Sequence, residues 1–157
     1  MIDYKKLVMV LAEGRVDFII VGGVAAILHG SVNATFDFDV VYAREQENIE
    51  RLVQAVAPFA PYLRDAPPGL PFVFDAVTIK NGLNFTLTTK LGDLDLLGEV
   101  IGGKTYEDLL PHAEEIEVFG VKCLCVGLEK LIHLKRAAGR PKDFEVLAEL
   151  EAILQNR

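Results

Sequence analysis

Two aspartates with a single residue between them are the strongest chemical signal in this chain. Asp37 and Asp39 flank Phe38, and Asp37 follows a glycine pair, Gly22 and Gly23, by fourteen residues counted from the second glycine. Side chains alternate along a strand, so both carboxylates project from the same face. Like charges held that close repel each other, and a bound divalent cation removes the repulsion. The pair therefore predicts a metal site.

The glycine pair follows an apolar run, 18–21, that is typical of a buried strand. Compact apolar residues after it predict a helix over 23–29. A strand that turns through glycine into a helix leaves free N–H groups at the helix start, where a phosphate can bind. A phosphate cradle beside paired carboxylates is typical of metal-assisted phosphoryl or nucleotidyl transfer. A lone glycine pair is equally explained as a tight strand-to-helix turn.

These residues, taken together, resemble a known superfamily. The glycine pair, its spacing and the Asp-apolar-Asp-apolar segment are similar to the nucleotidyltransferase superfamily, whose fold is related to that of DNA polymerase β. His29-Gly30 followed by Ala34 to Asp39 resembles the small bacterial nucleotidyltransferases of abortive-infection and toxin–antitoxin systems. The C-terminal run from Leu131 to Asp143 resembles the same branch, and the matches together span 18–150.

The resemblance implies a third metal-binding acid on a later strand, just before an apolar pair. Asp95 fits this position better than Asp93, which shares its face and remains open as a supporting residue. Two Mg²⁺ ions would then be held by three residues that are also catalytic: Asp37, Asp39 and Asp95.

The resemblance also implies a nucleotide-binding set that consists of Gly22, Gly23, Thr35 and Lys135. Lys135 is additionally expected to assist catalysis as a cation on the triphosphate oxygens. Each of the two polar side chains has a structural alternative. Lys135 could lay its stem along the apolar face of its helix and extend its amine to water. The hydroxyls of Thr35 and Ser31 could cap a turn.

The implied reaction transfers a nucleoside monophosphate from an NTP to a hydroxyl of tRNA or of a protein. A cognate toxin or antitoxin is then an expected partner. The alternative is a non-catalytic member of the same fold that binds nucleotide or a partner protein. Asn33 favours that alternative, because relatives often carry a basic residue near this position, whereas the intact carboxylates oppose it.

Several other polar residues have structural explanations. Asp143 is expected to cap the last helix, where a carboxylate near the N-terminus is favourable. For Arg140 and Lys142 two alternatives remain open, since their side chains are either exposed to solvent or placed to bind the phosphates of an RNA backbone. His29 ends a helix, and we expect it to make a structural hydrogen bond.

Composition places the chain among globular proteins. Its 157 residues are 51% hydrophobic and carry a net charge of −7, which argues against a broad nucleic-acid surface. We expect one domain, 1–157, with no membrane span and no signal peptide. Cys123 and Cys125 are expected to be reduced, so the predicted location is the cytoplasm.

The hydrophobic pattern predicts an α+β fold. The expected helices are 4–13, 23–29, 44–57, 105–111, 127–138 and 141–155, and the expected strands are 18–21, 37–42, 75–80, 84–89, 92–97, 116–119 and 121–126. Asn81-Gly82 predicts a hairpin, and 58–71, with five of the seven prolines, predicts an irregular loop. The resemblance implies a minimal nucleotidyltransferase fold, with a mixed, largely antiparallel twisted sheet, packed helices and a C-terminal helix pair that closes one side.

Overall fold

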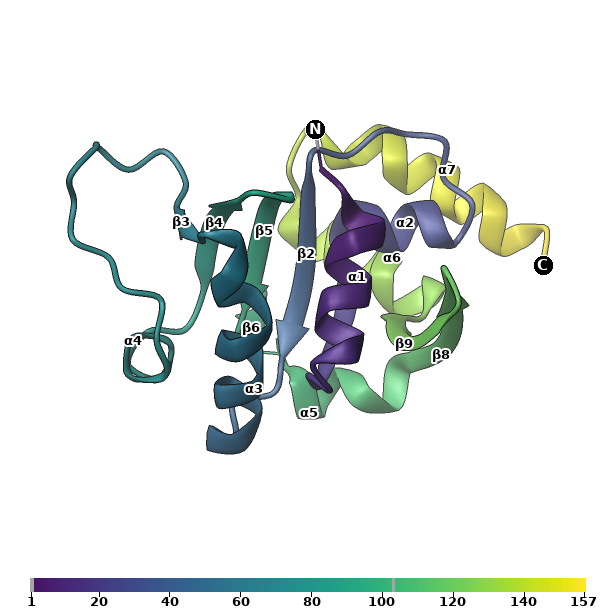
Figure 1. Cartoon of the computed structure of the whole chain (residues 1–157). Helices are drawn as coiled ribbons and strands as arrows, with labels where there is room; N and C mark the ends of the chain where they lie inside the picture. Colours follow the sequence, from purple (N-terminus) through teal and green to yellow (C-terminus); the bar gives the residue numbers. More distant parts are fainter. Residues whose placement is uncertain (1, 103) are drawn as a thin grey trace.

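The computed structural model describes residues 2–102 and 104–157. Its centre is a mixed sheet in which the described strands follow the order β3-β4-β5-β2-β1-β9-β8 (Figure 1). These strands are β1 Phe18–Val21, β2 Asp37–Tyr42, β3 Tyr62–Leu63, β4 Phe85–Thr89, β5 Gly92–Leu97, β8 Ala113–Val118 and β9 Val121–Val126. Only β1 with β9 and β2 with β5 pair in parallel among the described residues, so the sheet is largely antiparallel, as predicted.

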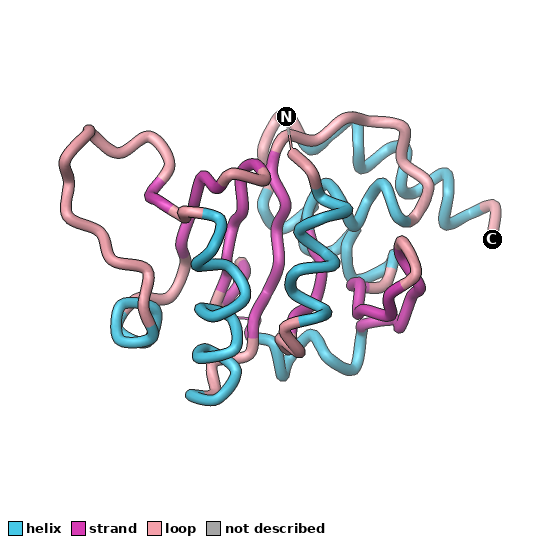
Figure 2. The backbone as a smooth tube through the Cα atoms, in the orientation of Figure 1, coloured by secondary structure: helices cyan, strands magenta, loops and turns pink. Residues whose placement is uncertain are grey.

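Helices cover both faces of this sheet, as the tube in Figure 2 shows. The α-helices are α1 Tyr4–Glu13, α2 Gly22–Leu28, α3 Gln46–Val56, α4 Ala76–Asn81, α5 Tyr106–Leu109, α6 Leu128–Ala138 and α7 Asp143–Gln155. Single 3₁₀ turns span Ala57–Phe59 and Leu110–His112, and a small second sheet pairs β6 Glu99–Val100 with β7 Lys104–Thr105. The pair α1 and α3 lies over one face, and α2 with α6 lies over the other (Figure 1).

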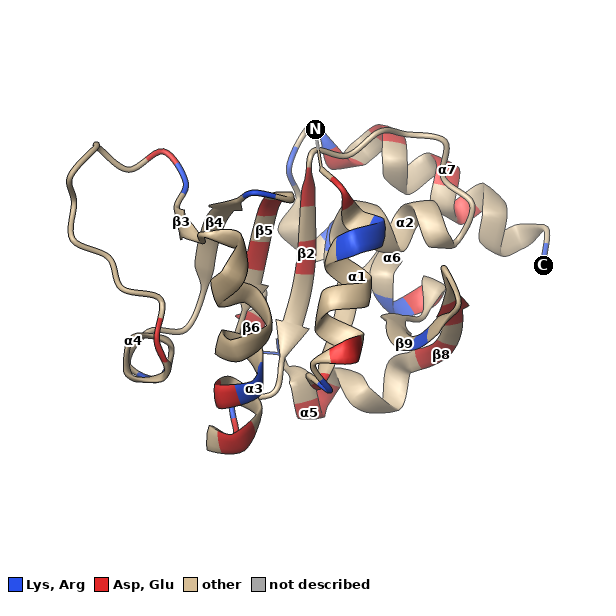
Figure 3. Cartoon of the chain, in the orientation of Figure 1, with Lys and Arg blue, Asp and Glu red and all other residues tan. Residues whose placement is uncertain are grey.

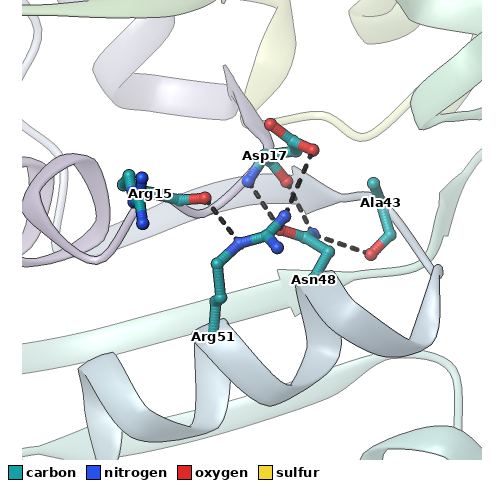
Figure 4. A network of polar contacts seen from close by, with 5 residues as sticks. All are labelled: Arg15, Asp17, Ala43, Asn48 and Arg51. Carbon is teal, nitrogen blue, oxygen red and sulfur yellow. Dashed lines mark hydrogen bonds and ion pairs between the residues drawn. The ribbon is translucent and has the colours of Figure 1, made fainter.

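A buried asparagine fixes the ends of the two central strands. Asn48 of α3 donates to the carbonyl oxygens of Asp17 at 3.0 Å and Ala43 at 2.8 Å, and it accepts from the Asp17 N–H at 2.7 Å (Figure 4). Arg51 lies one turn later and pairs with the Asp17 carboxylate at 3.6 Å. Because buried amide groups need partners, this network ties the start of β1 to the end of β2 and holds their register.

The segment 75–80 is a helix, so the predicted strand and its hairpin are wrong. Its alternating Val77 and Ile79 are typical of a strand, but Asp75 accepts a hydrogen bond from the Thr78 N–H at 2.8 Å and caps a helical turn. Gly82 then ends α4 instead of turning a hairpin. The helix cap at Asp75 therefore decides the structure of this segment, although the alternation of apolar residues is typical of a strand.

The proline-rich segment is irregular, as predicted, except for β3, which pairs with β4 at the sheet edge. Beyond β3 the chain projects away from the sheet before it returns to α4 (Figure 1). Tyr62 holds the start of this excursion, because its hydroxyl donates to the Leu70 carbonyl at 2.6 Å and its ring packs edge-on against Phe72.

The C-terminal helices α6 and α7 pack against each other, as expected. Gly139 ends α6 with a left-handed φ of 62°, and α7 begins at Asp143, two residues later than predicted. None of the described helices is both long and apolar enough to cross a membrane.

Candidate active site

The parallel pairing of β2 with β5 brings the predicted acids together. In this register Asp37 lies opposite Asp93, and Asp39 lies opposite Asp95. Each of Asp37, Asp39 and Asp95 contributes a carboxylate oxygen to a group whose members all lie within 4.8 Å of one another. Figure 3 shows the acidic bands side by side on the two strands. The structure therefore groups the three acids that the sequence indicated.

Among these three acids, Asp39 has the pKa that is raised most. Its Oδ1 atom is buried and has no hydrogen-bond partner among the described residues. Burial, with smaller contributions from the charges of Asp37 and Asp95, raises the pKa of Asp39 to about 8. A buried oxygen without a partner costs native stability, and a hard cation would satisfy it. The donor set consists of oxygens alone, so it fits Mg²⁺.

The pKa of Asp95 is raised less than that of Asp39, to about 6. Burial is the main cause of the rise, the guanidinium of Arg64 opposes it, and the charge of Asp37 adds to it. Arg64 pairs with Asp95 Oδ1 and, at 3.4 Å, with Asp93 Oδ2. Arg64 had no signal in the sequence, since it lies in the proline-rich segment, where no periodic pattern indicates its neighbours.

Both glycines of the turn lie too close to the site to carry a side chain. Gly22 has a φ of +68°, and a Cβ atom there would lie 2.9 Å from Cγ of Asp39. A Cβ atom on Gly23 would lie 2.7 Å from Cβ of Thr35. The two residues begin α2, whose first-turn N–H groups have no partner within the helix. The turn therefore presents backbone donors directly beside the acids.

The loop before β2 is fixed at both ends. Glu149 of α7 accepts from the hydroxyl of Ser31, from the Val32 N–H at 2.9 Å and from the Asn33 amide at 2.9 Å. Further along, the Thr35 hydroxyl donates to the Asp37 carbonyl at 3.3 Å. Asn33 thus binds α7, and this contact across more than a hundred residues had no signal in the sequence.

Lys135 of α6 is buried and paired. Its side chain is only 10% exposed, and Nζ lies 3.7 Å from Oδ1 of Asp143, whose side chain is 4% exposed. Arg140 donates from Nε to the other Asp143 oxygen at 2.9 Å. The alternative in which Lys135 extends into water is therefore wrong. Asp143 lies in the first turn of α7, as expected, but its side chain binds these two cations and does not cap the helix.

These residues share one cavity of about 340 Å³. Its lining combines the glycine turn and the acids with cations, and includes Gly22, Gly23, Thr35, Asp37, Asp39, Asp95, Lys135, Arg140 and Lys142. A second cavity of about 400 Å³ adjoins it and shares four lining residues: Gly22, Asp39, Lys135 and Arg140. The rest of that lining is mostly apolar and comes mainly from α6 and the β6 region, with single residues from β1, β5 and the segment before β4.

His29 has the structural role that we expected. Its Nε2 donates to the Val126 carbonyl at 2.7 Å, and Nδ1 accepts from Arg157 at 3.0 Å. Cys123 and Cys125 are both buried free thiols, and burial raises the pKa of Cys125 to about 12. These residues are therefore part of the packed fold and lie outside the lining of the two cavities.

Comparison by sequence gives no match, since no family model fits the chain and no curated protein is similar enough to align significantly. Comparison of structures does. The chain is similar to TM1012, a nucleotidyltransferase candidate from Thermotoga maritima, with a TM-score of 0.59 and 16% identity over 100% of this chain and 97% of that one.

Two further solved structures are similar to this chain to about the same extent. The lincosamide adenylyltransferase LnuA, bound to lincomycin, aligns with a TM-score of 0.63 and 12% identity over 96% of this chain and 97% of its own. ANT(2")-Ia, in complex with adenylyl-2"-tobramycin, aligns with a TM-score of 0.58 and 15% identity over 96% and 91%. The chain therefore has the nucleotidyltransferase fold that the resemblance implied.

Proposed function

We propose that this protein transfers a nucleoside monophosphate from an NTP to a hydroxyl group and releases pyrophosphate. The observation that carries the proposal is the carboxylate cluster with its unpartnered Asp39 oxygen, directly beside the Gly22 turn. Burial and neighbouring acids raise the pKa of Asp39 strongly, and ionisable groups with perturbed pKa values of this kind are concentrated at catalytic sites. The nucleotidyltransferase fold supports the same reaction class.

In this proposal Asp37, Asp39 and Asp95 would together hold two Mg²⁺ ions. Bound there, Mg²⁺ would neutralise charge on the triphosphate and help the acceptor hydroxyl to ionise. Asp39 keeps its proton at neutral pH in the free protein, because its pKa is raised to about 8. It must release that proton to act as a ligand.

The triphosphate would lie in the polar cavity. Gly22 and Gly23 would donate their backbone N–H groups to it, and three cations line the same space: Lys135, Arg140 and Lys142. Asp143 holds two of these cations in place. Positioned donors of this kind stabilise the charge that develops as pyrophosphate leaves.

The adjoining apolar cavity gives the reaction a second compartment. Its shared residues lie where the transferred phosphoryl group would be, so it has room for either the nucleoside or the acceptor. tRNA and protein side chains remain proposed acceptors, as does a role in a toxin–antitoxin pair. Lincomycin in one similar structure and adenylyl-2"-tobramycin in another add a small hydroxylated molecule to the acceptors worth testing.

A non-catalytic nucleotide-binding protein is the second candidate, and one observation favours it. Arg64 already pairs with Asp95, which the reaction needs as a metal ligand. A permanent ion pair there would leave the site able to bind nucleotide and unable to turn it over.

Turnover separates the two candidates. Each of the four NTPs, labelled at the α-phosphate, is incubated with Mg²⁺ or Mn²⁺ and with RNA, protein extract or hydroxylated small molecules. We expect label transfer with pyrophosphate release by the wild type and by Asp65→Asn, an exposed loop aspartate whose φ of 64° asparagine also adopts. Asp39→Asn should be inactive. NTP binding without transfer would favour the second candidate, and the absence of binding would contradict both.

A further inference from the structure

Arg64 is fixed at the edge of the sheet directly beside the acids. It follows β3, and its backbone N–H donates to the Thr86 carbonyl of β4 at 2.9 Å. Thr86 pairs with Asp95 in the next strand, and Thr88 pairs with Asp93. The Arg64 side chain therefore extends across β4 and reaches both aspartates, and it is only 20% exposed.

This contact places a positive charge on one ligand of the proposed metal site. Arg64 is the only cation that forms an ion pair with Asp37, Asp39 or Asp95 among residues 2–102 and 104–157. Guanidinium and a divalent cation both need the lone pairs of the same carboxylate, and two cations this close repel each other strongly in a partly buried site. Full occupancy by both is therefore unfavourable.

Asp93 offers Arg64 a second anchor. Its Oδ2 lies 3.4 Å from the guanidinium, and it stands outside the group of three acids whose oxygens converge. An arginine has five N–H donors in a fixed fork and can retain one carboxylate while it releases another. The site thus contains a position to which the guanidinium can withdraw.

We propose that Arg64 is a positioning residue that competes with the divalent cation for Asp95. It holds Asp95 in the metal-free protein and withdraws to Asp93 as the cation binds. This inference rests on the proposed function, since it assumes that the three acids hold a metal. It predicts that the chain itself weakens metal binding, so the cation is retained fully only when other ligands, such as triphosphate oxygens, compensate for the competition.

The test measures Mn²⁺ affinity without nucleotide, from the loss of the electron paramagnetic resonance signal of free Mn²⁺. Removing the competitor in Arg64→Gln should tighten binding by about tenfold, within the range typical of coupled charged groups. Arg64→Lys keeps the charge and should stay near wild type. Arg51→Gln is the matched control, because Arg51 also pairs with an aspartate, Asp17, at the other end of β1 (Figure 4).

A second variant tests the anchor itself, and Arg64→Met, which keeps an apolar stem of similar length without the charge, replaces Arg64→Gln in both experiments if Arg64→Gln fails to fold. Asp93→Asn removes the anchor and should weaken Mn²⁺ binding, and this effect should shrink clearly when Arg64→Gln is present as well. Unchanged or weaker Mn²⁺ binding by a folded Arg64→Gln would overturn the inference, as would equal effects of Asp93→Asn in both backgrounds.

Failure of the metal site itself has a different signature. If the wild type binds Mn²⁺ and Asp39→Asn does not, the metal site stands whatever Arg64 does, and the Arg64 variants test the competition alone. If neither the wild type nor any Arg64 variant binds Mn²⁺ at millimolar concentration, the metal site and the inference are both wrong.

Discussion

Asp39 of β2 and Asp95 of β5 lie opposite each other in a parallel register, and both belong to the group of converging carboxylates. Their surroundings nevertheless differ. Asp39 has a buried oxygen without a partner, whereas Asp95 is paired with Arg64. Replacement of aspartate by asparagine should therefore change the free energy of unfolding differently at the two positions. At alkaline pH, only the change at Asp39 removes a carboxylate charge that no cation compensates.

Asp39→Asn should stabilise the metal-free protein at alkaline pH. The pKa of Asp39 is raised from 3.8 to about 8 on folding, so within that window the folded state binds more protons than the unfolded state and stability falls as pH rises. Asparagine removes this loss. We expect a gain of about 5 kcal/mol at pH 8, since each unit of pKa shift is worth about 1.4 kcal/mol, and little gain near pH 4.

Urea unfolding with EDTA present, across this pH range, measures the effect. A loss of stability on Asp39→Asn at pH 8 would mean that the carboxylate is structurally satisfied in a way that the geometry does not indicate.

Asp95→Asn should give no comparable gain. It leaves Arg64 with Asp93 as its remaining partner, at 3.4 Å. We expect a gain smaller than that of Asp39→Asn, because the pKa of Asp95 is raised only to about 6 and loss of the ion pair with Arg64 offsets part of the relief. The same urea titrations at pH 8 compare it with Asp39→Asn. Equal stabilisation by both changes would contradict the stabilising contact between Arg64 and Asp95.

Gly22→Ala should disrupt the site, and Gly69→Ala is its control. Both glycines have a positive φ, +68° and +86°, but a Cβ atom would meet Asp39 at Gly22 and nothing within 4 Å at Gly69. We expect a cost of about 1 kcal/mol at Gly69 from the backbone alone and about 3 kcal/mol at Gly22. Thermal unfolding gives both values, and equal costs would show that Asp39 moves aside freely.

Lys135→Met should weaken NTP binding in the presence of Mg²⁺ by about tenfold, because it removes a buried cation that lines the polar cavity. Arg136→Met is the control, since Arg136 is an exposed cation on the same helix that pairs with Glu151 of α7. Calorimetric titration measures both. Equal affinity of Lys135→Met and wild type would restrict Lys135 to holding Asp143.

The acids of the site could be predicted because their signal is local. Asp37 and Asp39 alternate with buried residues along one strand, and Asp95 does the same on another, so the faces follow from the period of two. The convergence of the strands followed from the resemblance to a known fold.

Arg64 and Glu149 could not be predicted, because their contacts depend on long-range pairing. Arg64 reaches Asp95 only because the two-residue strand β3 joins the sheet edge, and proline-rich sequence does not indicate a strand. Glu149 meets Asn33 across 116 residues. The strand predicted at 75–80 is wrong for a different reason. The signal that decides the structure there, the helix cap at Asp75, is local and visible in the sequence, but the prediction gave more weight to the alternation of apolar residues.

A crystal structure with Mn²⁺ and a non-hydrolysable NTP would show whether the three carboxylates hold the metal. We predict an anomalous peak within coordination distance of Asp37, Asp39 and Asp95, with the triphosphate against the Gly22–Gly23 turn and Arg64 withdrawn from Asp95. Two results would contradict this prediction. One is metal and nucleotide bound elsewhere, and the other is an ordered nucleotide at this turn with no metal on the three carboxylates.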